Sequence, residues 1–432
     1  MNLSQSSQQT QTLMSFLEHA TSPYHTITTL SERLKACGFS ALDHTSAWSL
    51  TPGGKYFVTP YASCLIAFCI GSDVSPCDGF RIGAAHGDFP GFRVKPQPEL
   101  CKDGYIRLNT EGYGGVNHMS WLDRPLSLAG KVILRSDDPF APRVKLIDFK
   151  RPLLTIPNVA VHLLRDMNKG VELKKQTQML PLLGLTGEAV SDGVLRKLLA
   201  DELDCTPDEI LDYELNVYNF ENGCCIGANQ DFFQAPRLDD LTSVCALFEA
   251  LTDTDRSAGI NVFVVFDHEE IGSRTKQGAD SQLLPQTLKK IYHGLGYHTM
   301  QYEDALYHSL MMSVDVAHAL HPAYDSHYDP VHKCIPGKGF VIKQACSQSY
   351  ATDSEVIAII QQLCDAKQLP YQKFVNHSDE RGGGTLGSIA AALLPVRCAD
   401  IGVPILAMHS ARETMSLCDQ QALCEFLKQF YS

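Results

Sequence analysis

The sequence has no long hydrophobic segment and no cysteine pattern of a known kind. None of its apolar runs approaches the roughly 18 residues of a membrane span. The polar start MNLSQSSQQTQTLMSF also lacks the apolar stretch of a signal peptide. Its 15 cysteines include no CxxC pair, which argues against a zinc ribbon, and their spread along the chain argues against a disulfide scaffold. We therefore expect a cytoplasmic protein with reduced thiols and no membrane attachment.

Positive charge is also scarce. The formal net charge is -13, which argues against a general affinity for nucleic acids or anionic membranes. The apolar fraction of 44% and the charged fraction of 20% are those of an ordinary globular protein. A chain of 432 residues is too long for one simple core, so a large domain with a second or inserted domain is expected.

The texture of the sequence changes twice along the chain. After Pro236, apolar strands such as NVFVVF (261–266) alternate with long helices, which is typical of a mostly parallel sheet. From about residue 95 to 235, by contrast, proline, glycine and short strands dominate. The pattern predicts an α/β domain built from residues 1–94 and 236–432, with residues 95–235 inserted as a second domain.

Potential metal ligands lie where the predicted strands end. FRIGAA runs into His86, NVFVVF into Asp267–Glu270, SLMMSV into Asp315, and PILAM into His409; Asp239 and Asp240 precede a helix that starts near Leu241. In open α/β sheets, sites form at the carboxyl ends of strands, so these five points can converge on one crevice.

Each of these features has an ordinary explanation when it is taken alone. A single carboxylate after a strand is usually a turn residue, and a single histidine there is usually a hydrogen-bonded structural residue. The pair Asp239 and Asp240 could cap the helix that follows. The set of His, Asp, Glu, Asp and His at five such points favours a metallohydrolase.

Five segments resemble, in the same order, the signature segments of the aspartyl aminopeptidase family. They are AAHGDFPGFRVKP (84–96), QAPRLDDLTS (234–243), FDHEEIGS (266–273), SVDVAHALHP (313–322) and ILAMHSARE (405–413). The resemblance extends over essentially the whole chain. It implies a metal-dependent aminopeptidase that removes the N-terminal residue of peptides, with a preference for Asp or Glu.

The resemblance implies a set of metal ligands. Asp239 would bridge two zinc ions in each subunit; His86 and Asp315 would complete one ion, and Glu270 and His409 the other. Imidazole and carboxylate ligands without thiolate suit zinc, and manganese or cobalt could replace it.

The resemblance also implies roles for two further carboxylates. Asp88 would accept a hydrogen bond from the His86 ring and fix its orientation. Glu269, beside Glu270, would be the general base that takes a proton from the attacking water and delivers it to the leaving amine.

Two residues are expected to contact the substrate. Lys343 matches the basic residue with which the family receives an acidic side chain; otherwise it would be a surface lysine on a strand edge. His162 resembles a histidine that reaches from the second domain into a neighbouring subunit's active site; without the resemblance it would be a core histidine.

The implied fold is a parallel-rich mixed α/β sheet flanked by helices, like that of zinc exopeptidases, with an inserted β-rich dimerisation domain. The implied assembly is a homo-oligomer, a dodecamer built from dimers. Two alternatives remain open: an aminopeptidase of broad or neutral specificity, or a deacylase, on the same scaffold, and a non-catalytic self-assembling scaffold.

Overall fold

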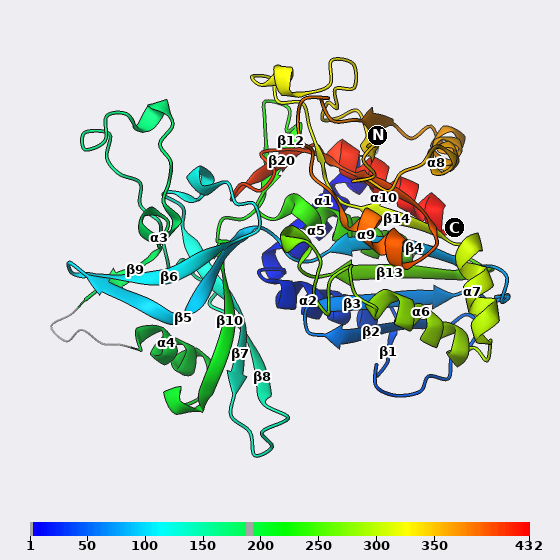
Figure 1. Ribbon diagram of the computed structural model, residues 1–432, viewed down its shortest axis with the longest axis horizontal. Helices are drawn as coiled ribbons and strands as arrows, with labels where there is room; N and C mark the ends of the chain where they lie inside the picture. The colour runs from blue at the N-terminus through cyan, green and yellow to red at the C-terminus, as the bar shows by residue number, and fades with distance from the viewer. Residues whose placement is uncertain (1–2, 187–192) are drawn as a thin grey trace. The chain divides into compact units, whose positions relative to one another are not determined.

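The computed structural model describes residues 3–186 and 193–432 (Figure 1). Its contacts divide the chain into two compact units. The first contains Met1–Asp88, Gly223–Met408 and Glu413–Ser432, and the second contains Phe89–Asn222 and His409–Arg412. The boundaries at 94/95 and 235/236 that the sequence pattern indicates stay a prediction.

A mixed sheet forms the centre of the first unit. Its central neighbours run parallel, while β2, β3 and β16 add antiparallel pairs. In spatial order the strands are β1 (Ser40–Ala41), β2 (Lys55–Tyr61), β3 (Cys64–Ile70), β13 (Ile260–Phe266), β4 (Phe80–His86), β14 (Leu310–Val314), β18 (Arg397–Gly402), β16 (Phe340–Lys343) and β17 (Tyr371–Phe374). The prediction of a parallel-rich α/β sheet is confirmed.

Helices cover both faces of this sheet. One face packs against α6 (Leu283–Gly294), α7 (Thr299–His308) and α9 (Leu386–Leu393) in one apolar core. On the other face, Gly83 lies against Leu247 and Tyr431, so closely that a Cβ there would collide with both side chains. These two residues belong to α5 (Leu238–Asp253) and α10 (Leu417–Tyr431). The remaining helices are α1 (Leu3–His19), α2 (Pro23–Ala36) and α8 (Ser354–Lys367).

A smaller sheet in the first unit contains the strand predicted at Pro404–Met408. The strand is shorter than expected, β19 (Pro404–Leu406), and it does not belong to the nine-stranded sheet. It pairs with β15 (Ala317–His318) on one side and with β20 (Glu413–Met415) on the other, so its partners come from segments that the apolar run itself does not indicate. The order of the smaller sheet is β11 (Cys224–Ile226), β12 (Phe232–Ala235), β20, β19 and β15.

The second unit is built on a six-stranded sheet whose neighbours are all antiparallel. Its strands are β8 (Arg143–Asp148), β7 (Leu126–Leu134), β10 (Ile210–Asn219), β5 (Gly91–Lys102), β6 (Tyr105–Tyr113) and β9 (Leu182–Leu185). The helix α4 (Val194–Leu203) packs Leu195 and Leu199 into the apolar core of this sheet, and the short α3 (Lys175–Gln178) lies near β6. The expected β-rich second part is thus present.

Among the helices of residues 3–186 and 193–432, none combines the length and the apolar character needed to cross a bilayer.

Candidate metal centre

Three neighbouring parallel strands end at the same edge of the nine-stranded sheet. His86, the last residue of β4, is in register with Phe266, the last residue of β13. On the other side of β4, Ser313 of β14 is paired with Ala84. As a result, His86, the turn after Phe266 and Asp315 all leave the sheet at one edge, as the parallel pattern predicts.

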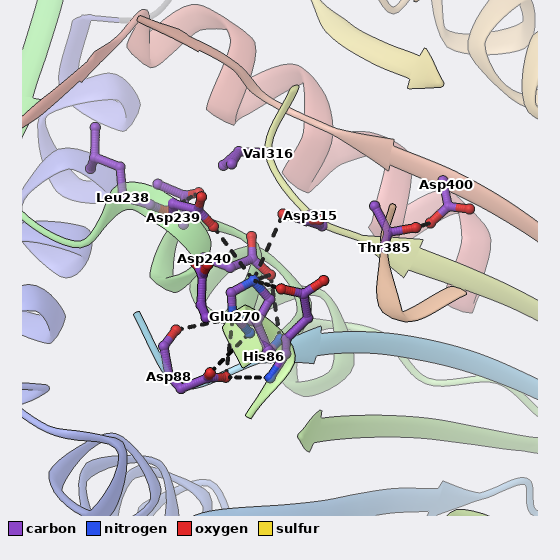
Figure 2. Close-up of polar contacts among 12 residues, drawn as sticks. His86, Asp88, Leu238, Asp239, Asp240, Glu270, Asp315, Val316, Thr385 and Asp400 are labelled. Atoms are coloured by element: carbon purple, nitrogen blue, oxygen red, sulfur yellow. Dashed lines mark hydrogen bonds and ion pairs between the residues drawn. The ribbon is translucent and has the colours of Figure 1, made fainter. Parts of the chain in front are cut away.

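The ring of His86 lies at the centre of a group of carboxylates (Figure 2). Its Nε2 is 3.4 Å from Asp239 Oδ1, 3.8 Å from Asp315 Oδ1 and 3.9 Å from Asp240 Oδ2. On the other side of the ring, Nδ1 lies 3.0 Å from the backbone carbonyl oxygen of Asp88 and 3.3 Å from its carboxylate. Because carbonyl and carboxylate oxygens only accept, Nδ1 carries the proton and Nε2 faces the other carboxylates.

His86, Asp239, Asp240 and Asp315 form what we call the acidic cluster. All four are buried, and each offers a ligand atom within 4.8 Å of the others. Asp239 and Asp240 lie at the start of α5 with non-helical backbone angles, and the N-cap position of this helix is Arg237. The carboxylates of the pair point toward His86.

The turn after β13 adds two glutamates. Glu269 and Glu270 belong to the 3₁₀ helix η4 (Glu269–Ile271), and with His86 they form a second group of potential ligands. The Asp88 carboxylate accepts the backbone N–H groups of Glu269 at 3.1 Å and Glu270 at 3.2 Å. Asp88 thus joins the end of β4 to the turn that carries both glutamates.

The electrostatics of this group favour a cation. Burial raises the pKa of Glu269 to about 8; His86 opposes this shift, and the Asp315 carboxylate adds to it. Burial also raises the pKa of Glu270 and of Asp240 well above their usual range. Burial alone would lower the pKa of His86, but its contacts with Asp239 and its other carboxylate neighbours raise it well above the usual value. These are the shifts expected where several buried carboxylates crowd together.

The donor set fits a divalent metal ion. Carboxylate oxygens and an imidazole nitrogen are the ligands that zinc accepts besides thiolate. A dication among these residues would offset the cost of burying several carboxylates at one point. The residues present therefore fit zinc on chemical grounds.

The sequence model for Aminopeptidase I zinc metalloproteases, M18, matches residues 16–431. The chain belongs to the M18 family. It is an aminopeptidase of the metallo-exopeptidase class. The "Probable M18 family aminopeptidase 2" of Clostridium acetobutylicum is 41% identical over 422 residues, which are 97% of this chain and 98% of that protein. The protein of the same name from Pseudomonas entomophila is also 41% identical and covers 97% of both chains.

Solved structures show the same M18 fold. The chain in the cryo-EM structure of the Ape4 and Nbr1 complex is 34% identical, with a TM-score of 0.95 over 99% of this chain and 86% of that one. The S. cerevesiae mApe1 dodecamer is 23% identical, with a TM-score of 0.84 over 98% of this chain and 95% of that one. At that identity the second likeness shows the fold alone.

Lys343 of this M18 chain is not a surface residue, since its side chain is 2% exposed. Its Nζ donates to the carbonyl oxygen of Val316 at 3.1 Å and lies 3.5 Å from Asp315 Oδ2. It also lies 5.3 Å from the centre of the Tyr350 ring. Burial alone would lower the pKa of Lys343, but the Asp315 charge raises it above its usual value. The ammonium is thus a charged neighbour of the acidic cluster.

His409 and His162 belong to the second unit. The Nδ1 of His409 lies 3.1 Å from the carbonyl oxygen of Gly115 in that unit. His162 is exposed and lies outside regular secondary structure, so the interpretation as a core histidine is wrong. The ligand role of His409 and the substrate role of His162 remain predictions.

Reasoning from the sequence missed two buried carboxylates beside the predicted ligands. Asp240 accepts the backbone N–H of His86 at 3.4 Å. Glu413 accepts the backbone N–H of Asp239 at 2.9 Å. The Asp239–Asp240 pair was a visible signal, because two adjacent carboxylates are costly to bury unless both are used. Nothing in the sequence around Glu413 pointed to its contact, since 174 positions separate the two partners.

Proposed function

We propose that this M18 aminopeptidase hydrolyses the N-terminal peptide bond of peptides, preferring Asp or Glu at the N-terminus, with two zinc ions per subunit. The buried acidic cluster at the ends of β4 and β14 and at the start of α5 carries the proposal. Together with the family membership, it favours a metal-dependent enzyme over a non-catalytic scaffold.

Five residues would hold the zinc ions: His86, Asp239, Glu270, Asp315 and His409. The first four belong to one compact unit, where His86 lies in a group with two of them and in another with Glu270. The choice of His409 as the fifth depends on the resemblance of the segment 405–413. When bound, zinc would supply Lewis acidity that activates water and polarises the scissile carbonyl.

Glu269 would move the proton. Its Oε2 lies 4.0 Å from His86 Nε2. A carboxylate at this position takes a proton from the water that attacks the scissile carbonyl carbon. The same proton then passes from the Glu269 carboxyl to the nitrogen of the leaving amine as the C–N bond breaks. Asp88 would hold the His86 ring and the backbone of Glu269 in place during both transfers.

Lys343 would select an acidic substrate side chain. An ammonium has three N–H donors, and two oxygen atoms lie near the Nζ of Lys343, those of Val316 and Asp315. A third donor would then be available to a substrate carboxylate, which a buried ammonium binds strongly. The ion pair with Asp315 favours the second candidate, an aminopeptidase of broad or neutral specificity. A lysine that only balances the charge of Asp315 would not select an acidic substrate residue.

A substrate panel tests both specificities. Release of N-terminal Asp, Glu, Leu and Lys from matched short peptides is measured with the zinc-loaded enzyme and with Lys343→Met. The acidic preference predicts that Asp or Glu leads in the wild type, and that Lys343→Met lowers the Asp-to-Leu ratio of kcat/KM about tenfold. Equal ratios in the two proteins would favour the neutral alternative. No release from any peptide would contradict the enzyme itself.

The assembly and location are proposals of the same kind. We expect a dodecamer built from dimers; the related mApe1 was solved as a dodecamer. His162 of the second unit would reach a neighbouring active site, as the resemblance of its segment implies. A molar mass in solution tests the assembly, and a monomer at working concentration would exclude it.

The proposed location is the cytoplasm, because the 15 free cysteines favour a reducing compartment.

A further inference from the structure

The turn that carries Glu269 and Glu270 is also held by residues 267–278, to some of which nothing above assigns a role. Residues 267–278 leave β13, form η4 and return to the point where they began. Asp267 donates its backbone N–H to the carbonyl oxygen of Gln277 at 3.1 Å, which closes the loop at its base. Gly278 lies so close to the carbonyl oxygen of Ser273 that a Cβ would come within 2.1 Å of it.

The residue before Glu269, His268, has an unusual backbone conformation. His268 has φ +64°, in the left-handed region that residues other than glycine seldom occupy. This conformation costs about 1–2 kcal/mol, so the surroundings must maintain it. Its carbonyl oxygen accepts the backbone N–H of Ser273 at 2.8 Å, and the next two residues are Glu269 and Glu270. The backbone of His268 therefore sets the direction in which the turn leaves the strand.

The His268 side chain bridges the two ends of this loop. Its Nδ1 lies 2.9 Å from Thr275 Oγ1, and its Nε2 lies 3.4 Å from Asp267 Oδ2. Asp267 is fully buried, and its carboxylate also accepts a hydrogen bond from the side-chain Nε2 of Gln277 at 3.4 Å. The contact with Thr275 is a hydrogen bond, and the contact with Asp267 is at ion-pair distance. We call these three side chains, Asp267, His268 and Thr275, the histidine brace.

We propose that the histidine brace positions the general base. Asp88 fixes the N–H groups of Glu269 and Glu270 from the sheet side. The brace holds the same turn through other contacts, because it ties the ring of His268 to Thr275, which lies six residues beyond Glu269. Neither His268 nor Thr275 is a metal ligand in the proposed site, so both act through the placement of the Glu269 carboxylate. Catalysis is sensitive to such placement, since a shift of about 1 Å can cost about a hundredfold in rate.

This inference rests on the proposed role of Glu269, and the experiment separates the two. Thr275→Val keeps the shape of the side chain and removes the hydroxyl proton. We expect kcat to fall about tenfold, while KM for a short peptide, the zinc content and Tm stay close to those of the wild type. Thr275→Ser restores the hydroxyl and should restore kcat. Thr252→Val is the matched control, because it removes a half-buried threonine hydroxyl that bonds to a helix carbonyl in α5.

His268→Asn provides a second variant in case Thr275→Val fails to fold. Asparagine tolerates the left-handed conformation, but its shorter side chain cannot bridge Asp267 and Thr275. It should lower kcat as Thr275→Val does. Glu269→Gln is measured in parallel, and it should lose nearly all turnover.

The outcomes are distinct. Wild-type kcat in both brace variants, with Glu269→Gln inactive, would overturn the brace and leave the proposed function intact. A fall of Tm and zinc content in step with kcat, not corrected by Thr275→Ser, would reduce the brace to a structural contact and also overturn the inference. Full activity of Glu269→Gln would instead remove the proposed general base.

Discussion

The two larger sheets of this protein bury different kinds of polar groups. The strands of the six-stranded sheet bury only uncharged polar side chains among the described residues: Thr110, Ser127, Asn216 and Asn219. At one edge of the nine-stranded sheet, by contrast, His86 and several carboxylates are buried together. Burying like charges is unfavourable unless a counter-charge is present. The buried acidic cluster thus belongs to the first unit, while the core of the six-stranded sheet serves stability.

Removal of the metal from the first unit should have the largest effect on turnover. We expect a chelator to lower turnover by a factor of roughly a thousand or more, because water activation is lost. Added zinc should restore activity, and magnesium should not. Peptide hydrolysis is measured together with the metal content by mass spectrometry. Full activity in protein shown to hold no metal would contradict the proposed site.

Glu269→Gln should have the next largest effect. The amide cannot take up the proton of the attacking water, so kcat should fall by about a hundred- to ten-thousandfold, while zinc stays bound. Glu249→Gln, at a half-buried glutamate on α5, is the control and should retain wild-type turnover. If Glu269→Gln loses its zinc, Glu269 is a ligand and the general base lies elsewhere.

A substitution in the core of the six-stranded sheet should affect stability and leave the chemistry unchanged. Leu215 in β10 is fully buried, so Leu215→Ala should lower the free energy of unfolding by about 2–5 kcal/mol. Leu211→Ala on the same strand, where the side chain is 45% exposed, should cost much less. Urea unfolding and kcat are measured for both. A large loss of kcat in folded Leu215→Ala would show that the core of the six-stranded sheet also supports the reaction.

Asp419 offers a smaller test, since it is buried away from the acidic cluster. Burial raises its pKa from the usual 3.8 to about 6, although the N–H groups of Gly337 and Gly339 oppose the shift. The folded protein therefore keeps the Asp419 proton to a higher pH than the unfolded chain does. Its contribution to stability falls as pH rises from about 4 to about 6, by about 2–3 kcal/mol.

The side chain of the Asp419→Asn variant does not ionise. The free energy of unfolding of this variant should therefore increase relative to that of the wild type as pH rises over this range. Urea unfolding at about pH 4 and about pH 7 measures it. Asp255→Asn, at an 88% exposed aspartate, is the control. A constant difference between Asp419→Asn and the wild type would mean that the backbone N–H groups keep the Asp419 pKa near its usual value.

Much of the first unit could be predicted from local patterns. The apolar run 261–266 forms β13 almost as expected, because a buried parallel strand is a continuous apolar segment. The helix predicted after Asp240 forms the regular part of α5. Prediction went wrong at Pro404–Met408, where the strand is shorter and belongs to another sheet. Sheet membership depends on pairing with distant segments, and the apolar run itself carries no information about its partner.

By itself, the sequence determined the family, the α/β pattern and the residues that stand at the strand ends. These depend on residue type, order and spacing, which are local. Only the tertiary structure decided that Asp240 faces His86, that Lys343 pairs with Asp315, and that His268 bridges Asp267 and Thr275. In each case the geometry and burial of the side chains decide the contact, and these exist only once the chain has folded.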